Sequence, residues 1–171
     1  MLEEYDARWP ATFERAASEL TKVEPSWIVE HIGSTALPGM AAKPIIDLAV
    51  RVGSFADVQA RFDSLATYGW LRIARGPQSH LVLVKQQGPR RTHIAHFFTT
   101  EQWSTCNQRI FRDWLLTHPQ DAARYLEVKR AAADHATDGR DYTARKTAVV
   151  QEIVDRARAA QGLPLVDVWE K

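Results

Sequence analysis

The feature that most constrains the fold is an apolar run, IIDLAVRV, at residues 45–52, which carries one aspartate. Runs this rich in β-branched residues favour strands, and alternate side chains of a strand point to opposite faces. Asp47 therefore lies on the face opposite Ile46 and Leu48. An ionised carboxylate buried without a partner is strongly destabilising. The run predicts a central strand on which Asp47 meets a cation, a metal ion or a cleft open to water; a structural pair with Lys43 or an arginine is the alternative.

A second β-rich run, WIVEHI at 27–32, ends at Gly33, which Ser34 and Thr35 follow. Residues 34–42 are long enough for about two helical turns. A glycine lets a ligand approach the backbone, the amides that follow point outward, and a serine hydroxyl adds a donor. The turn is thus a candidate anion site, although most Gly-Ser turns only reverse the chain.

The remaining pattern predicts helices from apolar spacing and three further strands from short β-rich runs, the last two joined by QQGPR. Because strands come first and helices later, we expect one α+β domain over 1–171, a mixed sheet covered by helices with a helical C-terminal part. The expected helices are 6–22, 54–68, 101–116, 119–133 and 140–160; the further strands are 70–74, 80–85 and 92–98; the tail 162–171 forms a short strand or stays loose.

Composition excludes several classes of protein. The formal net charge is +1, so no overall field attracts nucleic acid, and no apolar run approaches the ~20 residues that a membrane span needs. The first ten residues lack the basic and apolar regions of a signal peptide. We therefore expect a cytoplasmic protein without membrane or nonspecific nucleic-acid binding. Cys106, the single cysteine, is interpreted as a packing residue.

Histidines and late cations complete the candidate site. In THIAHF, alternation places Ile94 and His96 on one side of the strand, so His96 is a candidate ligand or general base, the alternative being a hydrogen-bonded core histidine. We expect His31 to orient the Gly-Ser turn. Further candidates are Arg112, Lys129, Tyr142 and Lys146, which carry a positive charge or share a helix face and could close a phosphate cleft. The alternative for each of them is a solvated surface, and Arg112 could instead form a structural pair with Asp113.

The order Gly-Ser followed by a strand aspartate resembles the opening of the nucleotidyltransferase fold, and EHIGSTALPGMAAKPIIDLAV resembles the GrpB family more closely still. YDARWPATFE, RTHIAHFF, FRDWLLTHP, YLEVKR and YTARKTAVVQEI extend the resemblance over nearly the whole chain. It implies a nucleotidyltransferase-type fold in which Gly33, Ser34 and Thr35 hold the phosphates of a nucleoside triphosphate and Asp47 holds magnesium. It also implies a similar domain in some bacterial dephospho-CoA kinases.

One departure from that pattern keeps two functions open. Nucleotidyltransferases place a second carboxylate two residues after the first, where this chain has Ala49, and Ile94 stands in place of a family histidine. The first hypothesis is a magnesium-assisted transfer of a nucleotidyl group, with Asp47 and His96 as catalytic residues and Lys43 or Lys146 neutralising charge. The second is a module that binds a nucleotide or phosphorylated small molecule, or stabilises a protein partner, without turnover.

Overall fold

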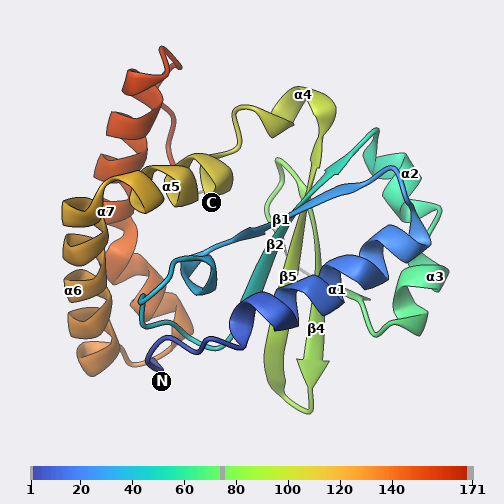
Figure 1. The fold of residues 1–171 in the computed structure, drawn as a ribbon, viewed down its shortest axis with the longest axis horizontal. Helices are drawn as coiled ribbons and strands as arrows, with labels where there is room; N and C mark the ends of the chain where they lie inside the picture. Colours follow the sequence, from blue (N-terminus) through green and yellow to red (C-terminus); the bar gives the residue numbers. More distant parts are fainter. Residues whose placement is uncertain (1, 74–75, 169–171) are drawn as a thin grey trace.

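The computed structural model describes residues 2–73 and 76–168, and within them five strands form one mixed sheet (Figure 1). The strand order is β1-β2-β5-β4-β3, with β2 and β5 parallel and all other neighbours antiparallel. The strands are β1 (Ile28–Ile32), β2 (Ile46–Val52), β3 (Leu71–Arg72), β4 (Leu81–Gln87) and β5 (Arg90–Thr99). The expected α+β fold with a mixed sheet is confirmed; the boundary of one domain at 1–171 stays a prediction.

Helices surround the sheet on several sides. α1 crosses one face, and α5, α6 and α7 pack on one another in a separate helical group, where α5 also contacts β1 (Figure 1). No helix in the described part of the chain is long and apolar enough to cross a membrane. The helices are α1 (Trp9–Val23), the 3-10 turn η1 (Ser34–Ala36), α2 (Phe55–Gln59), α3 (Phe62–Thr67), α4 (Thr100–Trp103), α5 (Asn107–Thr117), α6 (Pro119–His135) and α7 (Gly139–Ala160).

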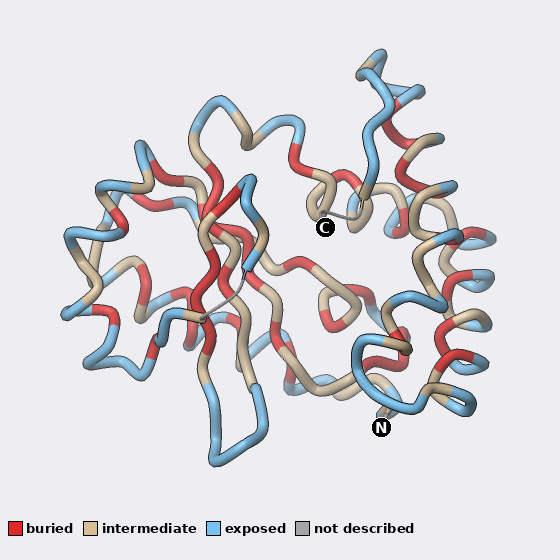
Figure 2. Tube along the Cα trace, turned by 180° about the vertical axis from the view of Figure 1, so that it is seen from behind, coloured by how far each residue is buried: buried red, intermediate tan, exposed pale blue. Residues whose placement is uncertain are grey.

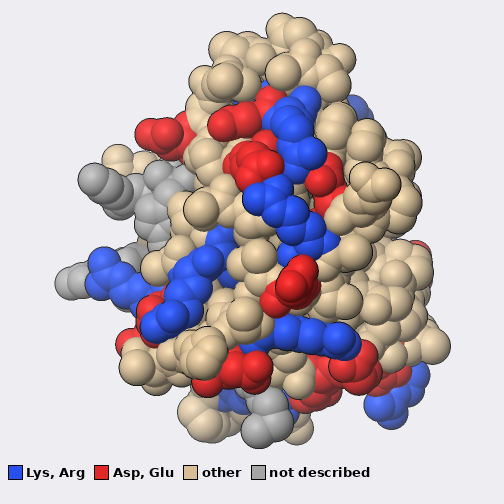
Figure 3. All heavy atoms as spheres, turned by 90° about the vertical axis from the view of Figure 1, so that its left-hand side faces the viewer, with Lys and Arg blue, Asp and Glu red and all other residues tan. Residues whose placement is uncertain are grey.

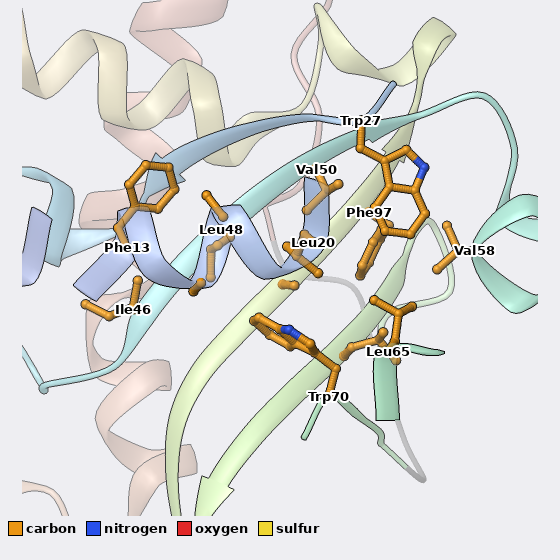
Figure 4. Close-up of a cluster of buried hydrophobic side chains, with 14 of the residues drawn as sticks. Phe13, Leu20, Trp27, Ile46, Leu48, Val50, Val58, Leu65, Trp70 and Phe97 are labelled. Carbon is orange, nitrogen blue, oxygen red and sulfur yellow. The ribbon is translucent and has the colours of Figure 1, made fainter. Parts of the chain in front are cut away.

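The core explains why α1 lies where it does. Trp9, Phe13 and Leu20 recur at helical spacing and belong to one buried apolar cluster with Leu48 of β2. Phe13 and Leu20 lie over Leu48 and its neighbours on the apolar face of β2 (Figure 4). Burial follows the central strands and the inner helix faces (Figure 2). Because α1 covers this face, the opposite face of β2, which carries Asp47, is left to the cleft.

Four stretches differ in extent from what the sequence indicates. Residues 34–42, which are long enough for about two helical turns, contain only the short turn η1, because Pro38 restricts the residue before it and Leu37 is extended. The helix expected at 54–68 is interrupted between Gln59, where α2 ends, and Phe62, where α3 starts. The helix expected at 101–116 is interrupted between Trp103, where α4 ends, and Asn107, where α5 starts. The strand expected at 70–74 covers only 71–72, and residue 74 lies outside the described part.

The hairpin and the tail have simple explanations. β4 and β5 form the predicted hairpin, and Gly88 supplies the positive φ of 59° that its turn requires. The tail forms neither a strand nor a free end as far as residue 168: Arg158 donates to the Pro164 carbonyl at 2.6 Å, and Gln151 donates to the Val166 carbonyl at 2.9 Å. Residues 169–171 of the expected tail lie outside the described part.

Candidate functional site

Asp47 projects from β2 into a site with apolar strand neighbours. In the sheet register it lies beside Ile32 of β1 and Ile94 of β5. Among the described residues, none forms a hydrogen bond or ion pair with its carboxylate, so the alternative of a structural pair with Lys43 is not realised. Burial raises the pKa of the Asp47 carboxyl to about 7, although Lys146 and other nearby cations act in the opposite direction.

The Gly33 turn lies directly against this carboxylate. Gly33 has φ +70°, and a Cβ built on it would lie 2.3 Å from Asp47 Oδ2. A side chain is therefore excluded twice, by backbone conformation and by space. The turn and the aspartate face each other across one site, as the sequence suggested.

Ser34 and Thr35, which follow the glycine, have different surroundings. The Thr35 side chain is buried; its hydroxyl donates to the Ile45 carbonyl at 3.3 Å and lies 2.9 Å from His31 Nε2. These contacts hold η1 to the start of β2, which is the orienting role expected of His31. Ser34 lines a small cavity together with Thr35, and it also interacts with the hydroxyl of Tyr125, whose pKa burial raises to about 12.

Lysines from three segments converge on Asp47. We call Lys43 of the loop before β2, Lys129 of α6 and Lys146 of α7 the lysine cluster. The ammonium groups of Lys43 and Lys146 lie 4.0 Å and 4.3 Å from the ring centroid of Tyr142. Lys129 is only 1% exposed, and its Nζ donates to the Ala41 carbonyl at 2.5 Å.

Burial dominates the electrostatics of these lysines. Together with repulsion from Lys146, it lowers the pKa of Lys129 to about 7, and together with repulsion from Lys43 it lowers the pKa of Lys146 to about 8. Attraction to Asp47 opposes both changes. No lysine of the cluster forms an ion pair with a carboxylate in the described part of the chain. Among the described residues that line the small cavity, the three lysines therefore share a single carboxylate, that of Asp47.

Two adjoining cavities make up the cleft. The smaller, of about 120 Å³, is lined by Ser34, Asp47, Tyr142 and the lysine cluster. The larger, of about 400 Å³, shares Ser34, Asp47 and Lys146 with the first and continues along the apolar side chains Phe111, Val150 and Val154. The cleft thus has a cationic end and an apolar extension.

His96 belongs to the extension rather than to the cationic end. It lines the larger cavity, and its Nδ1 lies 2.9 Å from His80 Nε2. Burial, reinforced by His80, lowers the pKa of His96 to about 3. The ring is therefore neutral near pH 7, with one nitrogen engaged.

Arg112 lies outside the cleft. It donates to the His31 carbonyl at 2.8 Å and to Glu30 at 2.7 Å, and it forms the expected pair with Asp113. Glu30 also accepts bonds of 2.9 Å from Arg109. These contacts fasten α5 to β1, so Arg112 supports the wall of the cleft and does not line it.

Sequence reasoning missed Tyr125 of α6. Its ring is 5% exposed and lies 5.2 Å from Lys129 Nζ and 6.0 Å from Lys146 Nζ, while its hydroxyl interacts with Ser34. The available signal was its position four residues before Lys129, which places both on one helix face.

The comparisons with known proteins decide the family. The model of the family described as GrpB protein matches residues 1–156. This chain belongs to the GrpB family. A UPF0157 protein of Halalkalibacterium halodurans is 36% identical over 161 residues, which cover 91% of this chain and 81% of that protein.

Solved structures support the same assignment for the fold. The crystal structure of the conserved protein GrpB from Enterococcus faecalis aligns with a TM-score of 0.84 and 28% identity, covering 95% of this chain and 99% of that one. Terminal uridylyl transferase 4 from Trypanosoma brucei with bound dUTP aligns with a TM-score of 0.56 and 13% identity, covering 90% and 55%. The fold of this GrpB-family chain is therefore of the nucleotidyltransferase type.

The residues around Asp47 do not form a magnesium site by themselves. Magnesium takes six oxygen ligands and is usually held by one or two carboxylates together with substrate phosphates and waters. Here Ala49 and Ile94 occupy the neighbouring positions on the same face, and the described residues contain no group of three His, Cys, Asp or Glu that could hold a metal. The donor set of this GrpB-family site therefore does not fit a metal held by the protein, and we derive no step through one.

The outer face of the helical group differs from its inner face. On the side formed by α6 and α7, Lys and Arg side chains alternate with Asp and Glu (Figure 3). Arg124 pairs with Glu152, and Arg156 pairs with both Glu152 and Asp121. Positive charge is thus balanced outside and left unbalanced where the lysine cluster faces the cleft.

Proposed function

We propose that this protein binds a nucleotide or another phosphorylated small molecule in the cleft, with its phosphate groups at the Gly33-Ser34 turn and the lysine cluster. The observation that carries the proposal is the convergence of three lysines and one carboxylate on a cavity of about 120 Å³. Charge-assisted hydrogen bonds are strong where water is largely excluded, and a bound anion would hold the lysines in their charged form.

The apolar extension gives the proposed ligand a second part. Small-molecule sites are typically clefts of about 300–1,000 Å³ with mostly apolar walls and a few polar groups. The larger cavity, of about 400 Å³, adjoins the cationic end and has Phe111 and Tyr125 in its walls. A nucleoside or a similar ring system matches this space. The structural relative of the same fold was solved with bound dUTP, which makes a nucleoside triphosphate the first compound to test.

Magnesium-assisted nucleotidyl transfer to a small acceptor is the second candidate function. It is favoured by the position of Asp47, which faces the Gly33-Ser34 turn from the central strand. It is opposed by Ala49, since substrate phosphates would have to supply most of the ligands of the ion. The role of His96 as the base of this reaction stays a prediction, and its pKa of about 3 counts against it, since a base acts best when its pKa lies near the working pH. A cytoplasmic location and a protein partner also remain proposals.

Thermal unfolding with a panel of nucleoside triphosphates and sugar phosphates tests binding. A ligand at 100 times its Kd stabilises the native state by about 2.7 kcal/mol, which for a chain of this size raises the Tm by about 5–10 °C. Lys146→Gln should lose most of this shift, whereas Lys22→Gln, which changes an exposed lysine of α1, should keep it. If no phosphorylated compound raises the Tm of the parent protein, the proposal is wrong. Release of pyrophosphate that depends on Asp47 would separate turnover from binding.

A further inference from the structure

The positions around Asp47 that could supply metal ligands are apolar. Ile32 lies beside it on β1, Ile94 lies beside it on β5, and Ala49 follows two residues later on the same face. Ile32 and Ala49 are 1% and 0% exposed. These two positions are therefore closed to water and to any loop that could supply a metal ligand in their stead. Among the described residues that line the small cavity, Asp47 is the only one that could offer a carboxylate to a divalent ion.

The lysine cluster already supplies positive charge at the same point. Its members come from the loop before β2, from α6 and from α7, and all of them line the small cavity together with Asp47 and Ser34. Lys129 is 99% buried, and one of the three N–H bonds of its ammonium is used by the Ala41 carbonyl. The Tyr142 ring makes a cation–π contact with Lys43, at 4.0 Å, and with Lys146, at 4.3 Å. A magnesium ion would therefore meet several cations and one carboxylate.

We propose that the lysine cluster replaces magnesium: the protein binds the free phosphate or pyrophosphate anion of its ligand, not the magnesium complex. This inference rests on the proposed function and specifies the form of the ligand. Ammonium groups bind phosphate oxygens as mobile donors without fixed coordination geometry. In this arrangement, chelation of the phosphates by magnesium removes the oxygens that the lysines would contact. Magnesium is then a competitor of the protein for the ligand.

Isothermal titration with dUTP and with pyrophosphate, each in EDTA and in excess magnesium, tests the inference. We expect binding in EDTA and at least tenfold weaker binding in magnesium. Tenfold or greater tightening by magnesium, or affinity that is unchanged by it, would overturn the inference and leave the proposed function standing. Absence of binding under both conditions, for both probes, would overturn this inference, and the proposed function would fall with it if no compound of the thermal panel raises the Tm either.

Two substitutions give opposite expectations for a metal-held and a lysine-held anion. In EDTA, Asp47→Asn should bind dUTP as tightly as the parent or more tightly, because a negative charge is removed, whereas Lys146→Gln should lose at least tenfold. Lys22→Gln is the matched control. Urea unfolding verifies that each variant is folded, and Lys43→Gln replaces Lys146→Gln if the latter is not. Loss of dUTP binding in a folded Asp47→Asn protein would also overturn the inference.

Discussion

Replacement of Asp47 by asparagine should make the protein more stable, and increasingly so as the pH rises. The folded state raises the pKa of this carboxyl from 3.8 to about 7, so the folded protein holds a proton that the unfolded chain has released. The stabilising contribution of the protonated form is complete below pH 3.8 and is lost as the pH rises towards 7. Asparagine keeps the shape of the side chain without this loss.

The size of the effect follows from the pKa. Because each tenfold change in proton affinity is worth about 1.4 kcal/mol, a pKa raised from 3.8 to about 7 corresponds to about 4 kcal/mol in total. About 3 kcal/mol of this falls between pH 5 and pH 8. The free energy of unfolding of Asp47→Asn should therefore gain about 3 kcal/mol relative to the parent over that interval, which is about 6–12 °C in Tm.

Urea unfolding of the parent and the variant at pH 5, 6, 7 and 8 measures this difference. Asp63→Asn, which changes an exposed aspartate of α3, is the control and should show no comparable pH-dependent gain. A difference between Asp47→Asn and the parent that stays constant within about 0.5 kcal/mol from pH 5 to pH 8 would refute the reasoning, because it would mean that the carboxylate is ionised in the folded state without a desolvation cost.

Three further predictions test the walls of the site. Gly33→Ala should lower the free energy of unfolding by more than ~2 kcal/mol, because the new Cβ would meet the Asp47 carboxylate. Gly88→Ala, whose Cβ would have nothing within 4 Å, should lower it by less in the same urea experiment. Glu30→Gln should lower the free energy of unfolding by about 2 kcal/mol, since it weakens bonds to two arginines of α5. Glu152→Gln on the exposed face should have a clearly smaller effect, and equal effects would contradict this. Burial raises the pKa of the Cys106 thiol, so a disulfide reagent at pH 8 should modify it at least tenfold more slowly in the folded protein than in urea; similar rates would show that it is accessible.

The sheet could be predicted because its signals are local. Alternation alone placed Asp47 opposite Leu48 and put Ile94 and His96 on one face of their strand, and the register confirms both. The Gly-Ser turn was recognisable because it directly follows a β-rich run, and in the structure Gly33 lies against the Asp47 carboxylate. These features depend on neighbouring residues and on the two-residue period of a strand.

The position of the lysine cluster could not be predicted from the sequence, because it depends on how distant segments of the chain are placed relative to one another. Lys129 and Arg112 lie on successive helices and have the same charge, yet one reaches the cleft and the other fastens α5 to β1. That choice depends on the orientation of each helix, which apolar spacing does not specify. The breaks after α2 and α4 were missed for a related reason, since tertiary contacts override a continuous helical pattern.

The bond from Lys129 to the Ala41 carbonyl joins residues 88 positions apart and connects the C-terminal helices to the loop that leads into β2. An anion held by the lysine cluster would add bonds across the same junction, so it would act as a clamp between the first and last thirds of the polypeptide. Its occupancy should then be visible as slower amide hydrogen exchange along α6 and α7, far beyond the atoms that it touches.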